Sequence, residues 1–129
     1  MLRTSDDLEA QLDRLERKYE RVGEGTYLVS VGPGRPPVAM RVAPPLLVLR
    51  VVVGPVGTKG AERQALLFRR LLELNATTLV HAAFGLEGDS IVLAAALELE
   101  TVDPNEIEAA LADMDMALAE HVPALRELV

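Results

Sequence analysis

Apolar side chains recur at helical spacing near the start of the chain. The intervals between them are four, three, four and three, which places them on one narrow stripe of a helix. They are Leu8, Leu12, Leu15, Tyr19 and Val22. Thr4 and Asp7 have the spacing of a capping box, with Asp in place of the usual Glu. The pattern therefore predicts one helix that begins after Thr4 and ends before Gly23.

The period of the pattern changes from helical to alternating after this helix. Residues 27–31 and 38–42 repeat large apolar side chains with a period of two, which predicts two half-buried strands. Gly and Pro dominate residues 32–37 between them and predict a turn or loop. Residues 46–53 are apolar almost throughout, apart from Arg50, which predicts a third strand covered on both faces.

A second helix is predicted from about Ala61 to Asn75. Its apolar side chains cover about half of the helix surface, a wider stripe than a simple surface helix shows. Arg and Glu side chains occupy the other half, with Leu66 among them. Such a helix either buries one face in the core and offers its flank to another chain, or is simply well covered by its own domain.

Two further strands and a third helix complete the pattern. Residues 79–86 and 91–99 are predicted to form a hairpin around the turn at 87–90. Asp103 has the position of an N-cap at the start of the last helix. Pro123 is expected to kink or restart that helix, because it cannot donate a backbone hydrogen bond.

Length and composition agree with one globular domain. The 129 residues are 50% hydrophobic and 26% charged. We therefore expect an α+β fold with the order α-βββ-α-ββ-α, in which an antiparallel sheet packs with helices. A single domain is expected over residues 1–129.

Net charge and the lack of cysteine exclude several classes of function. The formal net charge is −7 and aromatic residues are 3% of the chain, so binding to nucleic acid or to an anionic membrane is not expected. Without Cys there are no disulfides, iron–sulfur clusters or thiolate zinc sites. The N-terminal segment lacks the apolar region of a signal peptide, and no apolar run approaches the roughly 20 residues that span a bilayer. A cytoplasmic protein is expected.

One loop has the sequence context of a phosphate-binding site. Residues 54–60 lie between an apolar strand and a helix, where the backbone N–H groups and the Lys of a P-loop would hold phosphates. The spacing differs from that motif, because Lys59 precedes Gly60 and no hydroxyl residue follows. We therefore interpret the segment as a linker between strand and helix.

No other set of residues predicts catalysis, a cofactor or a metal site. His81 and His121 are far apart in the sequence, and each is interpreted as a structural side chain. Asp113 and Asp115 point to different faces of the last helix, where a solvated acidic surface is expected. We thus expect a protein that is not an enzyme and that holds no cofactor and no metal.

Several segments in the second half of the chain resemble a known family. They are LLELN (71–75), AFGLEGDSIVL (83–93), LEL (97–99) and DPNEIEAAL (103–111). With the element order, they resemble the class I type III secretion chaperones, the CesT/Tir-chaperone family, and the related YbjN-like proteins. These matches shape the fold and contain no catalytic residue. The Pro-rich segment 32–45 departs from the family's pattern.

The resemblance implies a small, non-catalytic protein that dimerises and holds a partner polypeptide. In secretion chaperones a partly unfolded client wraps around the dimer and uses apolar patches and sheet edges. For the homodimer interface we expect the wide second helix, which the family often uses, with Leu67, Phe68, Leu71, Leu72 and Leu74. For partner contact the candidate is the first helical stripe, with Leu8, Leu12, Leu15 and Tyr19. The same stripe also suits a contact with the domain's own sheet.

Three alternatives stay open. A secretion chaperone and a YbjN-like regulator are not separated by this sequence, whereas neighbouring genes would separate them, since secretion chaperones usually sit beside their clients. A roadblock-like scaffold that regulates a small GTPase expects three strands after its central helix, and two are predicted here. A nucleotide-binding protein would use loop 54–60, and ATP or GTP binding that is lost in Lys59→Ala would support it.

Overall fold

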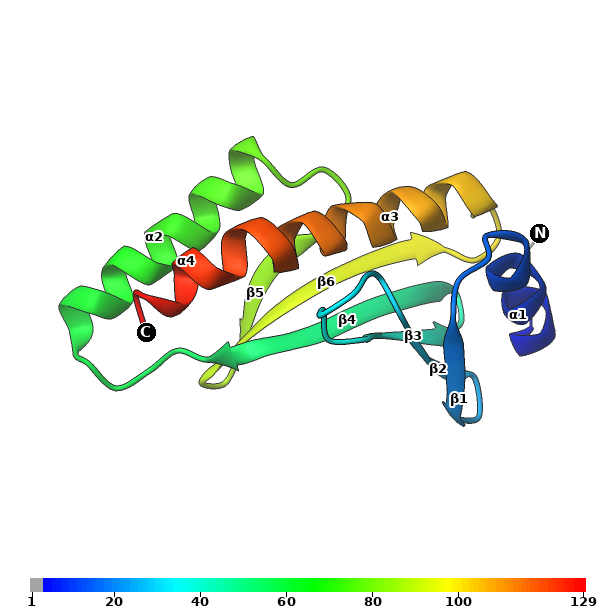
Figure 1. Cartoon of the computed structure of the whole chain (residues 1–129), viewed down its shortest axis with the longest axis horizontal. Coiled ribbons are helices and arrows are strands. Elements are labelled where there is room, and N and C mark those ends of the chain that lie inside the picture. The colour runs from blue at the N-terminus through cyan, green and yellow to red at the C-terminus, as the bar shows by residue number, and fades with distance from the viewer. Residues whose placement is uncertain (1–3) are drawn as a thin grey trace.

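A six-stranded antiparallel sheet supports the molecule, and helices lie across one of its faces (Figure 1). The computed structural model describes residues 4–129. Along the chain the elements are α1 (Ser5–Arg14), β1 (Tyr19–Gly23), β2 (Thr26–Val29), β3 (Val38–Ala43), β4 (Leu46–Pro55), α2 (Ala61–Thr77), β5 (Ala83–Glu87), β6 (Ser90–Glu98), α3 (Pro104–Met116), a π-helical turn (Ala117–His121) and α4 (Val122–Arg126). The predicted α+β class is confirmed. Four strands precede α2 where three were predicted, and the additional strand is β1.

The strand order across the sheet is β1-β2-β3-β4-β6-β5. The two longest strands, β4 and β6, pair antiparallel at its centre. A tight turn with Gly88 at a φ of 59° joins β5 to β6, which confirms the predicted hairpin. Its first strand begins at Ala83, because residues 79–82 form a loop.

The core lies between the sheet and the helices. Leu47, Leu49 and Val51 of β4 are buried in it, as the period of two along a strand requires. Leu67 of α2 and Ile107 of α3 belong to the same buried cluster. The apolar periods that predicted these helices and strands therefore meet in one core.

The opposite face of the sheet is covered by no helix of residues 4–129. On β4 this face carries Val48, Arg50 and Val52, and Val52 is 50% exposed. The prediction that this strand is covered on both faces is therefore wrong. An apolar run shows that a strand is hydrophobic, but it does not show whether one or both faces of the strand are covered by helices.

The first helix begins as predicted and ends early. Thr4 Oγ1 accepts the Asp7 N–H at 3.2 Å, and the Asp7 carboxylate accepts the Thr4 N–H at 3.0 Å. This is the predicted capping box, which satisfies backbone donors at the start of the helix. The helix then ends at Arg14 instead of continuing to Val22.

The early end of α1 is caused by a Schellman motif. Glu16 has a φ of 56°, its N–H donates to Asp13 O, and the Arg17 N–H donates to Leu12 O. The chain turns at this motif and enters β1, Tyr19–Gly23. The predicted continuation of the helix is therefore wrong, and its last apolar positions belong to a strand.

The last helix begins and breaks where the sequence predicts. Asp103 Oδ1 accepts the Glu106 N–H at 2.8 Å, with Pro104 as the first helical residue. The helix widens into the π-helical turn Ala117–His121 and continues as α4, with Pro123 in its first turn. Because Pro123 has no N–H to donate, the regular hydrogen-bond pattern is interrupted there.

The second helix, α2, begins at the predicted residue and is the longest helix. It has 17 residues, from Ala61 to Thr77. Within residues 4–129, neither α2 nor any other helix has the length and apolar character needed to cross a membrane.

Candidate partner-binding surfaces

The predicted partner-binding stripe faces the chain's own core. Leu8 and Leu12 are fully buried, and Leu15 and Tyr19 are half-buried. Tyr19 lies on β1 rather than on the helix. In this arrangement the four side chains hold α1 against the sheet, and their role in partner contact stays a prediction.

Two tyrosines of the sheet donate hydrogen bonds to carboxylates of α1. The Tyr27 hydroxyl donates to Glu9 Oε2 at 2.7 Å, and the Tyr19 hydroxyl donates to Asp13 Oδ1 at 3.1 Å. The two rings meet edge to face, with centroids 5.7 Å apart. Burial and then the hydrogen bond to a carboxylate raise the pKa of each tyrosine above its ordinary value. Both hydroxyls therefore remain protonated donors at neutral pH.

The residues predicted for the dimer interface fall on two sides of α2. Leu67, Leu71 and Leu74 lie in the core, and Leu71 is only 4% exposed. Phe68 is half-buried, whereas Leu72 is 68% exposed. A second chain that docks on this helix would therefore contact Leu72 directly, while the three core leucines support the helix from behind.

The solvent side of α2 carries exposed apolar side chains between charged ones, a surface that we call the outer stripe. A shallow groove follows it, and its members are Glu62, Ala65, Leu66, Arg69, Leu72, Glu73 and Ala76. Leu66 is 55% exposed. Arg69 Nε donates to Glu73 Oε1 at 3.2 Å along the stripe. The isolated position of Leu66 among charged residues was the sequence signal for this second apolar face.

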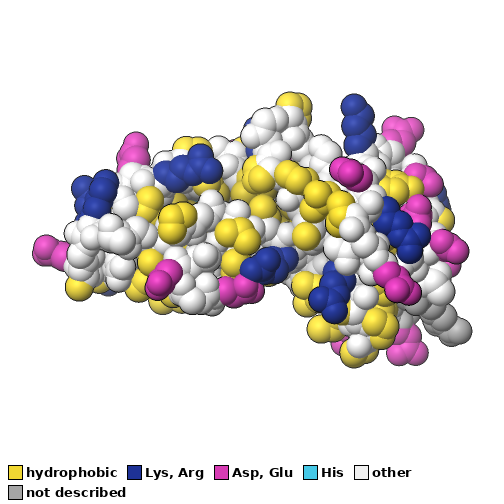
Figure 2. All heavy atoms as spheres, turned by 90° about the horizontal axis from the view of Figure 1, so that it is seen from below, with side chains coloured by type: hydrophobic (Ala, Val, Ile, Leu, Met, Phe, Trp, Pro, Cys, Tyr) yellow, Lys and Arg dark blue, Asp and Glu magenta, His cyan; other side chains and the backbone are white. Residues whose placement is uncertain are grey.

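The sheet face opposite the helices is a second solvent-exposed surface, which we call the exposed sheet face. By strand register it carries Glu20, Val22, Thr26, Leu28, Ala39, Arg41, Ala43, Leu46, Val48, Arg50, Val52, Ala83, Gly85, Glu87, Val92, Ala94, Ala96 and Glu98. Figure 2 shows the molecule from this side, with hydrophobic side chains gathered over the sheet and Lys or Arg side chains among them. Aliphatic and small side chains therefore dominate the surface.

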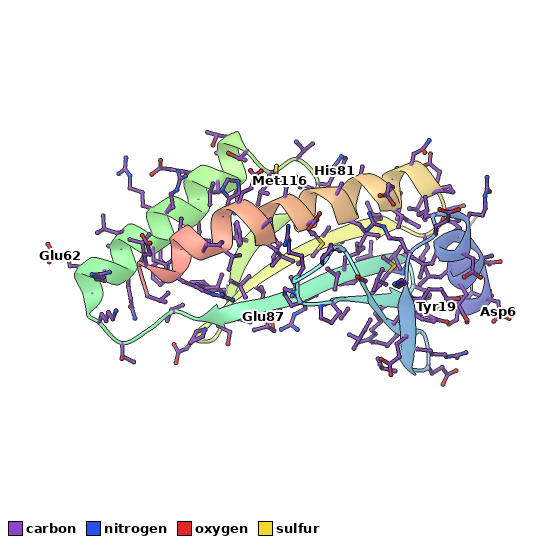
Figure 3. The ribbon with its side chains drawn as sticks, viewed as in Figure 1. Asp6, Tyr19, Glu62, His81, Glu87 and Met116 are labelled. Atoms are coloured by element: carbon purple, nitrogen blue, oxygen red, sulfur yellow. The ribbon has the colours of Figure 1, made fainter. Side chains whose placement is uncertain are left out.

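Arg50 and Glu87 form an ion pair across the exposed sheet face. Arg50 lies on β4 and Glu87 on β5, so the pair spans β6 between them, with Arg50 Nε 3.0 Å from Glu87 Oε1. Glu87 lies on the side of the sheet away from the helices (Figure 3). The hydrogen bond from Arg50 lowers the pKa of the Glu87 carboxyl, which keeps it charged. Val92 lies on β6 between the two residues and is almost fully buried.

At the β5 edge of the sheet, a side chain is hydrogen-bonded to the backbone groups that a further strand would need for pairing. Asn75 Nδ2 donates to Phe84 O at 2.9 Å, and Asn75 Oδ1 accepts the Phe84 N–H at 2.7 Å. Asn75 comes from α2, which packs against β5. The middle of this edge is therefore closed to a further strand.

At the β1 edge, the corresponding backbone groups point away from the sheet. Lys18 O accepts the Ser30 N–H, so the backbone groups of Lys18 point toward the neighbouring strand. Because these groups alternate in direction along a strand, the N–H and C=O groups of Tyr19 and Arg21 point away from β2. No residue in the described range 4–129 bonds the outward backbone groups of Tyr19 or Arg21. This edge is open to another strand.

Asp113 anchors the loop between α2 and β5. Its Oδ2 accepts the N–H groups of Val80 at 3.1 Å, His81 at 2.8 Å and Ala82 at 2.8 Å. The predicted solvated position is wrong for Asp113, which is 9% exposed, whereas Asp115 lies at the surface. Because the partners of Asp113 are backbone groups distant in sequence, no residue pattern marks this role.

The two histidines lie on different elements of the structure. His81 is exposed in the loop before β5 (Figure 3), and His121 is half-buried at the end of the π-helical turn. Among the described residues, His121 Nε2 has no hydrogen-bond partner. Within residues 4–129, no group of three or more His, Asp or Glu side chains is arranged to hold a metal ion.

The glycine-rich loop between β4 and α2 is hydrogen-bonded to the turn before β6 and to α2. The Val56 N–H donates to Asp89 O at 2.8 Å, and Gln64 Nε2 donates to Gly57 O at 3.2 Å. Lys59 is exposed to solvent. The loop thus joins strand and helix as the linker interpretation expects, with its lysine directed away from the core.

Several solved structures share the fold of this chain. The heterodimeric complex ExoU–SpcU from the type III secretion system of Pseudomonas aeruginosa has a TM-score of 0.69 and 15% identity, over 95% of this chain and 97% of that chain. The HopA1–SchA chaperone–effector complex has a TM-score of 0.62 and 15% identity, over 93% and 90% of the two chains. YbjN from E. coli has a TM-score of 0.56 and 13% identity, over 93% and 95%. The fold is that of the type III secretion chaperones and YbjN.

The family follows from the sequence itself. The CesT_Tir_1 family matches residues 1–129, and the chain therefore belongs to this family. No curated protein matches the sequence. The resemblance seen in the segments between residues 71 and 111 is confirmed, and it extends over the whole chain.

Proposed function

We propose that this chain is a cytoplasmic, non-catalytic homodimer that holds a partner polypeptide, as a secretion chaperone or a YbjN-like regulator. The observation that carries the proposal is the outer stripe of α2, where Leu66 and Leu72 are exposed on the longest helix. Membership of the CesT_Tir_1 family supports it. The occurrence of this fold in a chaperone–effector complex supports the partner polypeptide.

The outer stripe suits a two-fold pair of helices. Leu66 and Leu72 are each three residues from Arg69, on opposite sides of it. When two copies of α2 cross antiparallel at Arg69, Leu66 of each chain faces Leu72 of the other, as an isologous interface requires. Ala65 allows the two helices to approach closely. Glu73 compensates the Arg69 charge near the two-fold axis.

The partner polypeptide adds as a strand at the β1 edge. No residue of 4–129 pairs with the outward backbone groups of Tyr19 and Arg21 there, while Asn75 closes the edge at β5. Main-chain hydrogen bonds of this kind give affinity with little dependence on the partner's sequence. The dimer and the partner strand thus use different parts of the molecule.

The alternatives receive less support. A roadblock-like scaffold expects three strands after its central helix, and in residues 4–129 two strands, β5 and β6, follow α2. A nucleotide-binding role would require ATP or GTP binding that is lost in Lys59→Ala. A secretion chaperone and a YbjN-like regulator share this fold, and the genes beside the one that encodes this chain distinguish them.

The mass of the protein in solution tests the dimer. At low micromolar concentration we expect wild type to have the mass of two chains and Leu72→Asp to be a folded monomer. A charge at Leu72 costs little in the exposed monomer but must be desolvated in the interface. Sedimentation gives the mass, and circular dichroism reports the fold. A folded wild-type monomer would contradict the proposal.

Leu71→Asp is the matched control for this experiment. It introduces the same charge one residue away, at a core position that is 4% exposed. We expect this variant to unfold, because an unpaired charge in the core is strongly destabilising. If Leu72→Asp keeps both the fold and the dimer mass, the two copies meet on another surface.

A further inference from the structure

We propose that a pocket between the β2–β3 loop and the last helical segment binds a small aliphatic carboxylate through the guanidinium groups of Arg35 and Arg126. We call it the two-arginine pocket. None of its lining residues belongs to α2 or to β1, so it is separate from the outer stripe and from the β1 edge. The inference therefore goes beyond the proposed function.

Three segments that are distant in sequence form the walls of the two-arginine pocket. Residues 34–36 come from the loop between β2 and β3, Val52 and Val53 from the end of β4, and the third wall is one side of the segment 118–126. The cavity has a volume of about 350 Å³, which is within the range of small-molecule sites. In Figure 1 the loop rises toward the helices from the sheet.

The cavity exists because the sheet becomes narrower at this place. The pairing of β3 with β4 ends at Arg50, whereas β4 remains paired with β6 as far as Pro55. The loop residues that could continue the pairing with β4 include Pro36 and Pro37, which have no N–H to donate. These prolines lie in the segment that departs from the family's pattern, so the pocket is a feature of this chain.

Arg35 is held in a fixed orientation at the pocket. Its Nε donates to Asp115 Oδ1 at 3.0 Å, and its Nη1 donates to Pro33 O at 2.8 Å. No residue in the range 4–129 accepts a hydrogen bond from Arg35 Nη2. The guanidinium group is therefore preorganised and keeps N–H donors for a ligand.

Arg126 is the second cation, and it has no partner of its own. Within residues 4–129, no ion pair or hydrogen bond joins its side chain to another residue. It reaches the pocket from α4, whereas Arg35 reaches it from the loop. One oxyanion can thus bridge two segments of the chain through charge-assisted hydrogen bonds.

The charges around the pocket favour a ligand with a single negative charge. No Asp or Glu is among the lining residues, although the chain has 20 acidic and 13 basic residues. Arg35 and Arg126 contribute two positive charges and Asp115, behind Arg35, one negative charge, which leaves one positive charge for the ligand. A carboxylate matches this balance better than a phosphate, which is largely doubly charged at neutral pH.

The other walls of the pocket favour an aliphatic body on this carboxylate. Val53, Leu118 and Val122 lie beside the two arginines. A second cavity, of about 270 Å³, shares Val53 and Arg126 with the pocket and is also lined by Ile91 and Leu125. A branched aliphatic chain that extends from the carboxylate would bury apolar surface there. Such a group occurs in a free short-chain acid and at the carboxyl terminus of a polypeptide whose last residue is aliphatic.

Titration with 4-methylpentanoate tests the pocket, with binding followed by calorimetry and by the NMR signals of the backbone amides. We expect the acid to bind wild type and to shift the amide signals of Gly34, Ala119 and Val122. The uncharged amide of the same acid should bind about tenfold or more weakly, because it lacks the charge that the arginines bind. Inorganic phosphate should also bind more weakly than the acid, since it has no aliphatic body.

Two variants place the ligand in the pocket. Arg126→Gln changes an exposed side chain and should weaken binding of the acid about tenfold or more. Ala119→Leu keeps both arginines and fills the cavity, so it should also weaken binding. The matched control is Arg70→Gln, which removes an exposed arginine on α2 and should bind the acid as wild type does. Circular dichroism reports the fold of each variant, and if Ala119→Leu unfolds, Arg126→Gln decides.

A second ligand identifies the source of the carboxylate. A tripeptide that ends in leucine with a free carboxyl group is compared with 4-methylpentanoate. Tighter binding of the tripeptide assigns the pocket to a polypeptide terminus, and tighter binding of the acid assigns it to a free acid; either result supports the inference.

Three results would overturn the inference. They are no binding of the acid or the tripeptide to wild type, equal binding of the acid to wild type and Arg126→Gln, and binding of phosphate as tight as that of the acid. None of them concerns α2, so the masses of wild type and Leu72→Asp still decide the proposed dimer.

Discussion

At the scale of single residues, Glu16 determines where the first helix stops. Its φ of 56° lies in the left-handed region, which a side chain with a Cβ adopts at a cost. Two hydrogen bonds compensate this cost by closing the end of α1. The chain can then turn back and place β1 beside β2, which creates the edge proposed for the partner strand.

We expect Glu16→Gly to raise the free energy of unfolding by about 1 kcal/mol, because glycine adopts a positive φ without steric strain. The control is Glu20→Gly, at an exposed position of β1. In a strand the same substitution should lower the free energy of unfolding by about 0.5–1 kcal/mol. Urea denaturation measures both values, and a loss of stability in Glu16→Gly would contradict this role of the backbone conformation.

We expect Asp113→Ala to lower the free energy of unfolding by about 2–3 kcal/mol, because it leaves three backbone N–H groups without their acceptor. Asp115→Ala, two residues away, removes a surface ion pair and should cost less than about 1 kcal/mol. Hydrogen exchange should accelerate at Val80, His81 and Ala82 only in the first variant. Equal losses in the two variants would argue against the anchor.

Residue roles could be predicted where both partners are close in sequence. The caps formed by Thr4 and Asp103 are examples, because each side chain bonds a backbone group three residues on. Glu16 could not be predicted, since Glu is a good helix former and the apolar spacing continues beyond it. The role of Asp113 depends on a loop about thirty residues earlier in the chain, which only the tertiary fold brings near.

At the scale of elements, α2 contributes to both the core and the surface. Its inner leucines are buried, and its outer stripe faces solvent. Through Asn75 it also closes the neighbouring edge of the sheet. One helix therefore carries the surface proposed for a second copy and also blocks a strand from pairing beside β5.

We expect Asn75→Ala to free the backbone groups of Phe84 and to accelerate hydrogen exchange at the Phe84 amide. The free energy of unfolding should fall by about 1–2 kcal/mol, since two partly buried hydrogen bonds are lost. Thr77→Ala is the control on the same helix, because the Thr77 hydroxyl bonds only nearby groups, Glu73 O at 2.7 Å and Thr78 Oγ1 at 3.2 Å. It should leave Phe84 exchange unchanged. An unchanged Phe84 rate in Asn75→Ala would contradict the closure of this edge.

Most elements follow from the period of apolar positions, and the exceptions have a physical cause. Tyr19 and Val22 continue the helical spacing of Leu8 and Leu12 by coincidence, so β1 was hidden within the predicted helix. The apolar run of β4 suggested two covering layers, although one of its faces is exposed. In the candidate interface, the period identified α2 but did not separate the buried Leu71 from the exposed Leu72.

At the scale of the whole molecule, the outer stripe of α2 and the β1 edge lie at opposite edges of the sheet. Helix α2 packs on β5, at one edge of the sheet, and β1 forms the other edge (Figure 1). The exposed sheet face lies opposite the helices. A second copy and a partner strand therefore need not compete for the same side chains.

We expect the Tm of wild type to rise with protein concentration over a roughly hundredfold range, because unfolding of a dimer releases two chains. The Tm of Leu72→Asp should stay constant over the same range. Thermal denaturation followed by circular dichroism measures both. A wild-type Tm that does not depend on concentration would contradict the homodimer.

The single side chain of Asn75 also limits how far such molecules can aggregate. A sheet with two open edges allows β1 of one molecule to pair with β5 of the next, and this step can repeat into a fibril. With Phe84 already bonded to Asn75, a molecule added at β1 has no second site for continued growth. The protein is thereby expected to remain dispersed at high concentration.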